Sequence, residues 1–268
     1  MPLGIVPVLL LLSSGAVVGL TLGLIGGGGS VLAVPLLVYL VGVPSAHVAI
    51  GSSAVAVALN AAWGLVSHAR LGTVKWPCAM VFTAAGVTGA FAGASLGKQL
   101  GGTELLALFG LVMIAIGVYM LTFKPKLTAH DVKLTRENAA HLLPRLLAIG
   151  AGVGLLSGFF GIGGGFLIVP GLVLATGMAL QNAIGTSLFA VTTFGLATAT
   201  SYSSSGLVDW RLAGLVVAGG IVGTLIGTRV NVRLAGHRRA LAITFASVVI
   251  GVGLYVVASG ITQLLASG

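Results

Sequence analysis

The sequence predicts an all-α polytopic membrane protein with two inverted-topology repeats, each a glycine-tipped broken-helix hairpin plus three full transmembrane helices. Hydrophobic residues make up 57% of the 268 positions and charged residues only 6%, with a mean hydropathy of +1.15. An average soluble domain is about 25% charged. Apolar runs of about 20 residues, the length that crosses a bilayer, recur along the whole chain. A glycine cluster with its flanking sequence occurs twice.

The first repeat is predicted to cover residues 1–122 and to open with a hairpin over 5–42. Its first arm, 5–25, has no charged region ahead of the apolar run, so we expect a retained segment rather than a cleaved signal peptide. Its second arm, 30–42, is too short to span a bilayer alone. Three full transmembrane helices are predicted to follow, over 46–68, 76–98 and 103–122.

The second repeat is predicted to cover residues 144–268 and to follow the same order. A polar, basic stretch over 123–143 separates the halves and is expected to be a cytoplasmic linker. A hairpin over 144–178 then precedes full helices over 182–203, 210–232 and 238–264.

The duplication extends well beyond the glycine clusters. Gly51-Ser52-Ser53 reappears as Gly185-Thr186-Ser187, and Gly86, Gly89 and Gly93 reappear as Gly220, Gly223 and Gly227. The glycine spacing in both copies gives each helix a small-residue face suited to close packing. One register kept over so long a stretch indicates a true internal repeat.

The positive charges indicate how the repeats face. All Lys and Arg residues except Lys98 and Arg211 fall in three clusters, namely Arg70 with Lys75, residues 123–145, and residues 229–239. Basic loops are usually cytoplasmic. All three clusters reach one side only if each glycine cluster is the tip of a hairpin that returns to the side it left. Each half then crosses an odd number of times, so the repeats are inverted and both termini lie outside the cytoplasm.

The two glycine clusters are the predicted substrate site. Irregular backbone at membrane depth is tolerated where it lines a cavity or is buried in protein. The short arms begin at the clusters, and a helix N-terminus carries about half a positive charge and, with glycine backbone, binds anions. Two such ends meeting near the midplane is a recurring plan of secondary transporters. The alternative is that the glycines only permit tight helix packing.

Paired hydroxyls form the second candidate feature, because they donate to anion oxygens without adding fixed charge. The alternative for them is ordinary hydrogen bonding between helices. The predicted substrate-binding residues are Gly26, Gly27, Gly28, Gly29, Ser30, Ser52, Ser53, Gly161, Gly163, Gly164, Gly165, Thr186 and Ser187.

No charged residue lies in the middle of an apolar segment, and no residue cluster suggests a metal site or an activated nucleophile. Buried carboxylates or histidines usually mark intramembrane proton relays. We therefore predict neither enzyme activity, nor a cofactor, nor a metal. His47 and His68 are expected to face the membrane interfaces, and Cys78, which can form no internal disulfide, to be a small core residue. The net charge of +9 is explained by cytoplasmic loops rather than by nucleic-acid binding.

Taken together, these motifs resemble a known family. Two Gly-x-Gly-Gly-Gly/Ser motifs, each followed by a proline five residues on, in duplicated halves with a basic central loop, resemble the TauE/SafE family of bacterial membrane permeases, also called the TSUP or sulfite exporter family. The resemblance covers about residues 15–265, with Ser30 standing where the second motif has Gly165.

The resemblance implies a multi-pass protein of the bacterial inner membrane. It further implies movement of a small sulfur-containing anion, such as sulfite, sulfoacetate or another organosulfonate, with export as the expected direction. Two alternatives stay open at this point, namely a membrane assembly or maturation factor that transports nothing, and a permease for another small anion. The oligomeric state is open as well.

Overall fold

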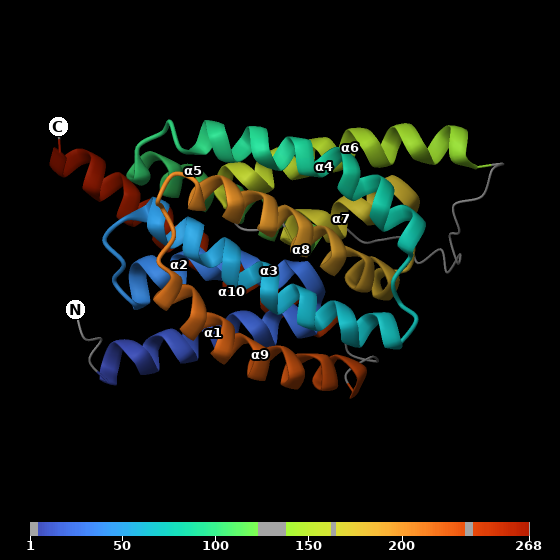
Figure 1. Cartoon of the computed structure of the whole chain (residues 1–268), viewed down its shortest axis with the longest axis horizontal. Coiled ribbons are helices and arrows are strands. Elements are labelled where there is room, and N and C mark those ends of the chain that lie inside the picture. Colours follow the sequence, from blue (N-terminus) through green and yellow to red (C-terminus); the bar gives the residue numbers. More distant parts are fainter. Residues whose placement is uncertain (1–4, 123–137, 162–164, 234–237, 268) are drawn as a thin grey trace.

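The computed structural model describes residues 5–122, 138–161, 165–233 and 238–267, and these residues form helices and no strand (Figure 1). Within these ranges, eight helices are long and apolar enough to cross a membrane. They are α1 (Ile5–Ile25), α3 (Ala46–Arg70), α4 (Trp76–Gly97), α5 (Gly102–Thr122), α6 (Ala139–Phe160), α8 (Leu180–Ser203), α9 (Trp210–Arg233) and α10 (Arg238–Ser267). The all-α polytopic class predicted from the sequence is confirmed.

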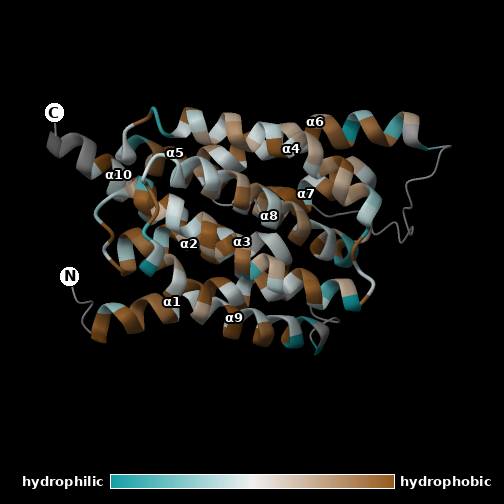
Figure 2. Ribbon diagram, viewed as in Figure 1, coloured by the Kyte–Doolittle hydropathy of each residue, from teal (hydrophilic) through white to brown (hydrophobic). Residues whose placement is uncertain are grey.

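Two shorter apolar stretches complete the described fold. After α1 the chain continues through a 3₁₀-helix, η1 (Gly26–Leu32), one short turn, α2 (Ala33–Pro35), and a π-helical turn, η2 (Leu36–Leu40). The counterpart after α6 is α7 (Gly165–Thr176). Hydrophobic residues recur along the long helices in Figure 2, and many large hydrophobic side chains are exposed, such as Leu9, Leu111 and Leu254, as a lipid environment requires.

The helices of the two halves exchange partners. Helix α1 packs along α9 of the other half, and α6 packs along α4. In Figure 1, α1 and α9 run from left to right, whereas α4 and α6 run from right to left. The hairpin that opens each half is therefore held by a helix of the other half.

Glycines make these two crossings close. A Cβ atom built on Gly19 of α1 would overlap the backbone of Gly220 in α9, and one built on Gly154 of α6 would overlap the backbone of Gly86 in α4. The two contacts are equivalent in the repeat. Small residues of this kind allow membrane helices to approach backbone to backbone, where dispersion contacts stabilise the pair.

Helices α3 and α8 form the centre of the molecule. Their spans are 72% buried, whereas those of the other six long helices are between 33% and 44% buried. They cross where Gly195 of α8 meets Ala54 and Ala58 of α3, and they run in opposite directions in Figure 1. Helices α5 and α10 pair with each other.

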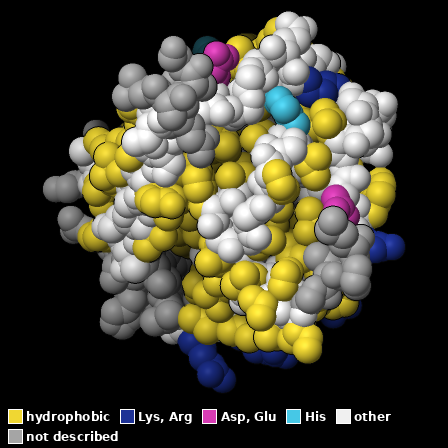
Figure 3. Space-filling view, turned by 90° about the vertical axis from the view of Figure 1, so that its left-hand side faces the viewer, with side chains coloured by type: hydrophobic (Ala, Val, Ile, Leu, Met, Phe, Trp, Pro, Cys, Tyr) yellow, Lys and Arg dark blue, Asp and Glu magenta, His cyan; other side chains and the backbone are white. Residues whose placement is uncertain are grey.

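One end of the bundle is poor in charge. Figure 3 looks onto the left-hand end of Figure 1, where α1 begins and α10 ends. Hydrophobic and uncharged side chains occupy most of this face, and the few charged ones are scattered around its rim.

Candidate functional site

The two glycine clusters meet inside the protein. A Cβ atom built on Gly27 of η1 would lie 2.6 Å from Cα of Gly165, the first residue of α7, and 2.6 Å from Cγ2 of Val191 in α8. Ordinary carbon contacts are about 3.5–4.0 Å, so only glycine permits this approach. The described site glycines and Ser30 are buried, namely Gly26, Gly27, Gly29, Ser30, Gly161 and Gly165. Gly163 and Gly164 lie outside the described residues, and Gly28 is described only as part of η1.

Each tip turns on a glycine that packs against the other half. Gly26 has φ +71° and Gly161 has φ +66°, a left-handed conformation that favours glycine. A Cβ atom on Gly26 would lie 2.8 Å from Cγ2 of Ile184 in α8, and one on Gly161 would overlap Cγ2 of Ile50 in α3. Ile50 and Ile184 are equivalent in the repeat, so the two tips sit on matching positions of the central helices.

The structure at the first tip, residues 26–30, differs from the prediction, which was a glycine break followed by a short helix over 30–42. The cluster itself is helical, because η1 begins at Gly26. The backbone N–H of Gly27 donates to Oγ of Ser187 at 3.3 Å, and Oγ of Ser30 donates to the Gly27 carbonyl at 2.9 Å. Ser187 thus satisfies one of the N–H groups that the start of a helix leaves unpaired, and Ser30 adds a bond within the first turn.

The second residue of each hydroxyl pair is a serine, and Ser187 contacts the first tip. Ser187, which accepts the hydrogen bond from Gly27, also donates to the carbonyl of Ile184 at 2.7 Å. Ser53 makes the equivalent bond to the carbonyl of Ile50 at 2.9 Å. Both serines are fully buried.

The first hydroxyl of each pair bonds the backbone of the other half instead of a tip. Oγ of Ser52 accepts a hydrogen bond from the backbone N–H of Asp209 at 2.9 Å, and Oγ1 of Thr186 accepts one from the backbone N–H of Lys75 at 3.0 Å. Each bond joins a central helix to the residue just before a helix of the other half. This geometry favours the alternative of interhelical hydrogen bonding for Ser52 and Thr186.

The surroundings of the tips are uncharged. Among the described residues, no Asp, Glu, Lys or Arg side chain is buried, and no group of three His, Cys, Asp or Glu could hold a metal. Cys78 is buried, as expected. The interfacial placement of His68 was wrong, because its ring is 3% exposed and its Nδ1 lies 3.0 Å from Oγ1 of Thr73. The polar groups recorded at the first tip are backbone amides, carbonyls and hydroxyls, and its other neighbours are apolar side chains such as Ile184 and Val191.

The comparisons with known proteins decide the family. Residues 11–256 match the family described as sulfite exporter TauE/SafE. The chain belongs to this family. It is 46% identical to a "Probable membrane transporter protein" of Xylella fastidiosa (strain 9a5c), over 92% of this chain and 93% of that protein. No solved structure matches.

More distant relatives carry similar names. The probable membrane transporter protein YdhB of Bacillus subtilis is 25% identical over 79% of this chain and 85% of its own. The probable membrane transporter protein MJ0441 of Methanocaldococcus jannaschii is 30% identical over 62% and 61%. The family and these names indicate a membrane transporter rather than an enzyme.

In this TauE/SafE protein the two halves differ at a buried position, Asn60 in the first half and Phe194 in the second, which from the sequence alone is a weaker candidate than the hydroxyl pairs. The Asn60 amide is fully buried against Gly220, and neither its nitrogen nor its oxygen has a partner among the described residues. The equivalent Phe194 lies against Gly86 and stacks on Phe82 with ring centroids 6.2 Å apart. The mismatch of Asn60 with Phe194 is visible in the sequence, but the missing hydrogen-bond partners of the amide are visible only in the structure.

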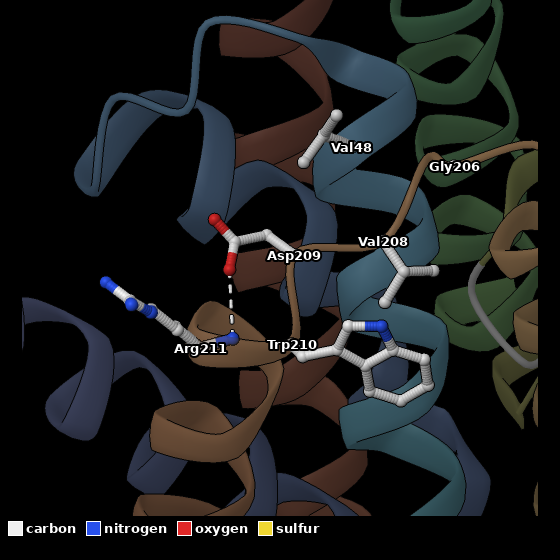
Figure 4. Close-up of a pocket in the computed structure, with 6 residues that line it drawn as sticks. All are labelled: Val48, Gly206, Val208, Asp209, Trp210 and Arg211. Atoms are coloured by element: carbon white, nitrogen blue, oxygen red, sulfur yellow. Dashed lines mark hydrogen bonds between the residues drawn. The ribbon is translucent and has the colours of Figure 1, made fainter. Parts of the chain in front are cut away.

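A surface hollow of about 600 Å³ lies beside Asp209, whose backbone N–H donates to Oγ of Ser52 (Figure 4). Its lining consists of Val48, Gly206, Val208, Asp209, Trp210 and Arg211. Oδ1 of Asp209 accepts hydrogen bonds from the backbone N–H groups of Arg211 at 2.9 Å and Leu212 at 3.2 Å, which caps the start of α9. No residue of the glycine clusters lines this hollow.

Proposed function

We propose that this TauE/SafE protein transports a small sulfur-containing anion, such as sulfite, sulfoacetate or another organosulfonate, and binds it at the paired glycine tips. The contact between Gly27 and Gly165 in buried, uncharged surroundings is the observation that carries the proposal. When the tips separate, the N–H of Gly27 is released from Oγ of Ser187 and can donate to ligand oxygens. The Ser187 hydroxyl donates to the ligand as well once it turns away from the Ile184 carbonyl. Ser53 supplies a second hydroxyl at the equivalent position of α3.

The uncharged surroundings suit a transporter because the anion must also leave. A full positive charge at the site would add Coulomb attraction to every hydrogen bond that the anion makes there. A site built of backbone amides and serine hydroxyls therefore holds an anion less tightly than one built of Arg or Lys. Release then needs only the return of the tips to each other.

Charge at the helix ends supports one orientation. Arg70, Lys75, Arg229 and Arg233 lie where α3 and α9 end and α4 begins, at the right of Figure 1, whereas Lys98 and Arg211 lie at the left. By the positive-inside rule, the right-hand end is cytoplasmic. The start of α1 and the end of α10 then lie outside the cytoplasm. The opposite directions of the equivalent helices α3 and α8 support the inverted repeats.

Export follows from this orientation and from the membrane potential. A potential of 100 mV, negative inside, contributes about 2.3 kcal/mol per charge and drives anions outward. In a bacterial inner membrane, an anion would enter from the basic end and leave at the end where the termini lie.

The experiment is uptake of labelled sulfite and organosulfonates by proteoliposomes, together with thermal unfolding in the presence of the same anions. A ligand that binds only the folded state raises the unfolding temperature. Ser187→Ala should weaken binding by about 1–3 kcal/mol, because a hydrogen bond to a charged ligand is lost. Thr192→Ala is the matched control, since Thr192 bonds only the carbonyl of Leu188 on the same helix. Absence of flux and of stabilisation across the whole panel would refute the proposal.

A further inference from the structure

We propose that the loops 71–75 and 205–209 are the two gates of the transport path, and that Thr186 and Ser52 are the positioning residues that hold them shut. The proposal rests on the transport function above, but it assigns these two hydroxyls to the gates rather than to the substrate.

The two loops are copies of each other. Each turns on a glycine with positive φ, Gly72 at +69° and Gly206 at +70°. The backbone N–H of Thr73 donates to the His68 carbonyl at 3.2 Å, and that of Leu207 donates to the equivalent Tyr202 carbonyl at 3.0 Å. Loop 71–75 lies between α3 and α4, and loop 205–209 lies between α8 and α9.

Each loop lies over the start of the central helix of the other half. A Cβ atom built on Gly185 of α8 would lie 3.1 Å from Cβ of Thr73, and one built on Gly51 of α3 would lie 3.1 Å from the carbonyl carbon of Leu207. The hydrogen bonds of Thr186 to loop 71–75 and of Ser52 to loop 205–209 hold the loops in these positions.

The same short segments also contact the glycine tips. In α8, Gly185 and Thr186 contact loop 71–75, while Ile184 and Ser187 contact the first tip. The arrangement in α3 is equivalent. Ile50 contacts Gly161 of the second tip, while Gly51 and Ser52 contact loop 205–209. A shift of either tip thus acts directly on the segment that holds the loop at that end.

With both hydrogen bonds formed, the tips are buried and the path is closed at both ends. The hollow of Figure 4 reaches loop 205–209 from outside and places solvent against one gate. The gates carry unlike charges at equivalent positions, Lys75 at the basic end and Asp209 at the other. A cationic mouth raises the local concentration of anions, which favours loading at the Lys75 gate.

Alternating access makes a prediction that simple packing does not. If the gates open in turn, removing one hydrogen bond favours the state open at that end and depletes the state open at the other. A hydroxyl that only packs two helices would loosen its own end and leave the far end unchanged. Accessibility at the two ends therefore separates the two roles.

The chain offers matched reporters for this measurement. Cys78, in the first turn of α4 just after loop 71–75, is 1% exposed, and its equivalent Leu212, just after loop 205–209, is 9% exposed. The rate of alkylation by N-ethylmaleimide is measured on Cys78 in the otherwise unchanged protein, and on a Leu212→Cys reporter in a Cys78→Ala background. Thr192→Ala and Gly214→Ala, the latter with open space at its Cβ position, are the controls.

We expect Thr186→Ala to speed alkylation at Cys78 by about two- to tenfold, because that factor corresponds to the loss of one hydrogen bond. The same variant should slow alkylation at the Leu212→Cys reporter. Ser52→Ala should do the reverse. Gly185→Ala and Gly51→Ala give a second route to the same result, because their Cβ atoms would push the respective loop outward without changing a hydroxyl.

The gate proposal would be overturned if a variant changed the alkylation rate only at the reporter nearer to it, or at neither reporter. Sulfite flux is measured on the same preparations, so the two proposals can fail separately. Opposite changes of the alkylation rate at the two reporters, without flux of any sulfur oxyanion, would support the gate proposal and refute the proposed substrate. Flux of a sulfur oxyanion, without opposite changes of the alkylation rate at the two reporters, would support the proposed substrate and refute the gate proposal.

Discussion

Gly27→Ala tests the contact between the two tips. The added Cβ would lie 2.6 Å from Cα of Gly165, 2.6 Å from Cγ2 of Val191 and 2.8 Å from the Gly165 carbonyl oxygen. Because ordinary carbon contacts are 3.5–4.0 Å, the tips must separate by roughly 1 Å. Overpacking of this kind costs about 1–3 kcal/mol, while alanine recovers at most about 1 kcal/mol through helix propensity.

The assay is the midpoint of thermal unfolding, with and without sulfite. A loss of 1 kcal/mol lowers the midpoint by about 2–4 °C in a chain of this size. We expect a lower midpoint and a smaller stabilisation by sulfite, since the N–H of Gly27 moves with the tip. Gly214→Ala, which meets nothing within 4 Å, should leave both unchanged or slightly raise the midpoint. A Gly27→Ala protein that behaves like Gly214→Ala would refute the reasoning.

Three further outcomes are expected. Asn60→Leu should raise the unfolding free energy by about 1–3 kcal/mol, because a buried amide without a partner among the described residues is removed; a fall in the denaturation midpoint would contradict this. Outward flux of a monovalent anion should be favoured roughly fiftyfold by 100 mV and persist without a pH or sodium gradient, as measured with a potassium diffusion potential; flux that follows only pH would exclude it. Reporter fusions at Gly268 and within 123–137 should report outside and cytoplasm respectively, and a cytoplasmic C-terminus would disprove the inverted hairpins.

Much of the fold was accessible from the sequence because a bilayer demands long apolar runs. The partners of the helices were not accessible, and the reason is the duplication itself. Helices α4 and α9 carry the same glycine spacing, with Gly86 and Gly220 at equivalent positions. Helix α1 could therefore pack against either, and only the three-dimensional arrangement pairs its Gly19 with Gly220.

The candidate site was accessible in part for a similar reason. The density of glycine marked the tips, and the contact of Gly27 with Gly165 brings two of the predicted residues together. The roles of Ser52 and Ser53 could not be separated, because neighbours on a helix point about 100° apart and the sequence does not say which direction holds the tip. The helical form of the first cluster was missed because a run of four glycines predicts a break in the helix, and the partner of the Gly27 N–H, Ser187, belongs to the other half.

The exchange of helices between the halves bears on how such a chain arose. If the halves were separate molecules, the contact of α1 with α9 and that of α6 with α4 would both lie between chains, and they would be the same contact made twice. One short chain inserted in both orientations would then have assembled as an antiparallel pair through its own glycine face. Joining two copies would make that assembly obligatory and would let the copies differ, as Asn60 and Phe194 do at one equivalent position.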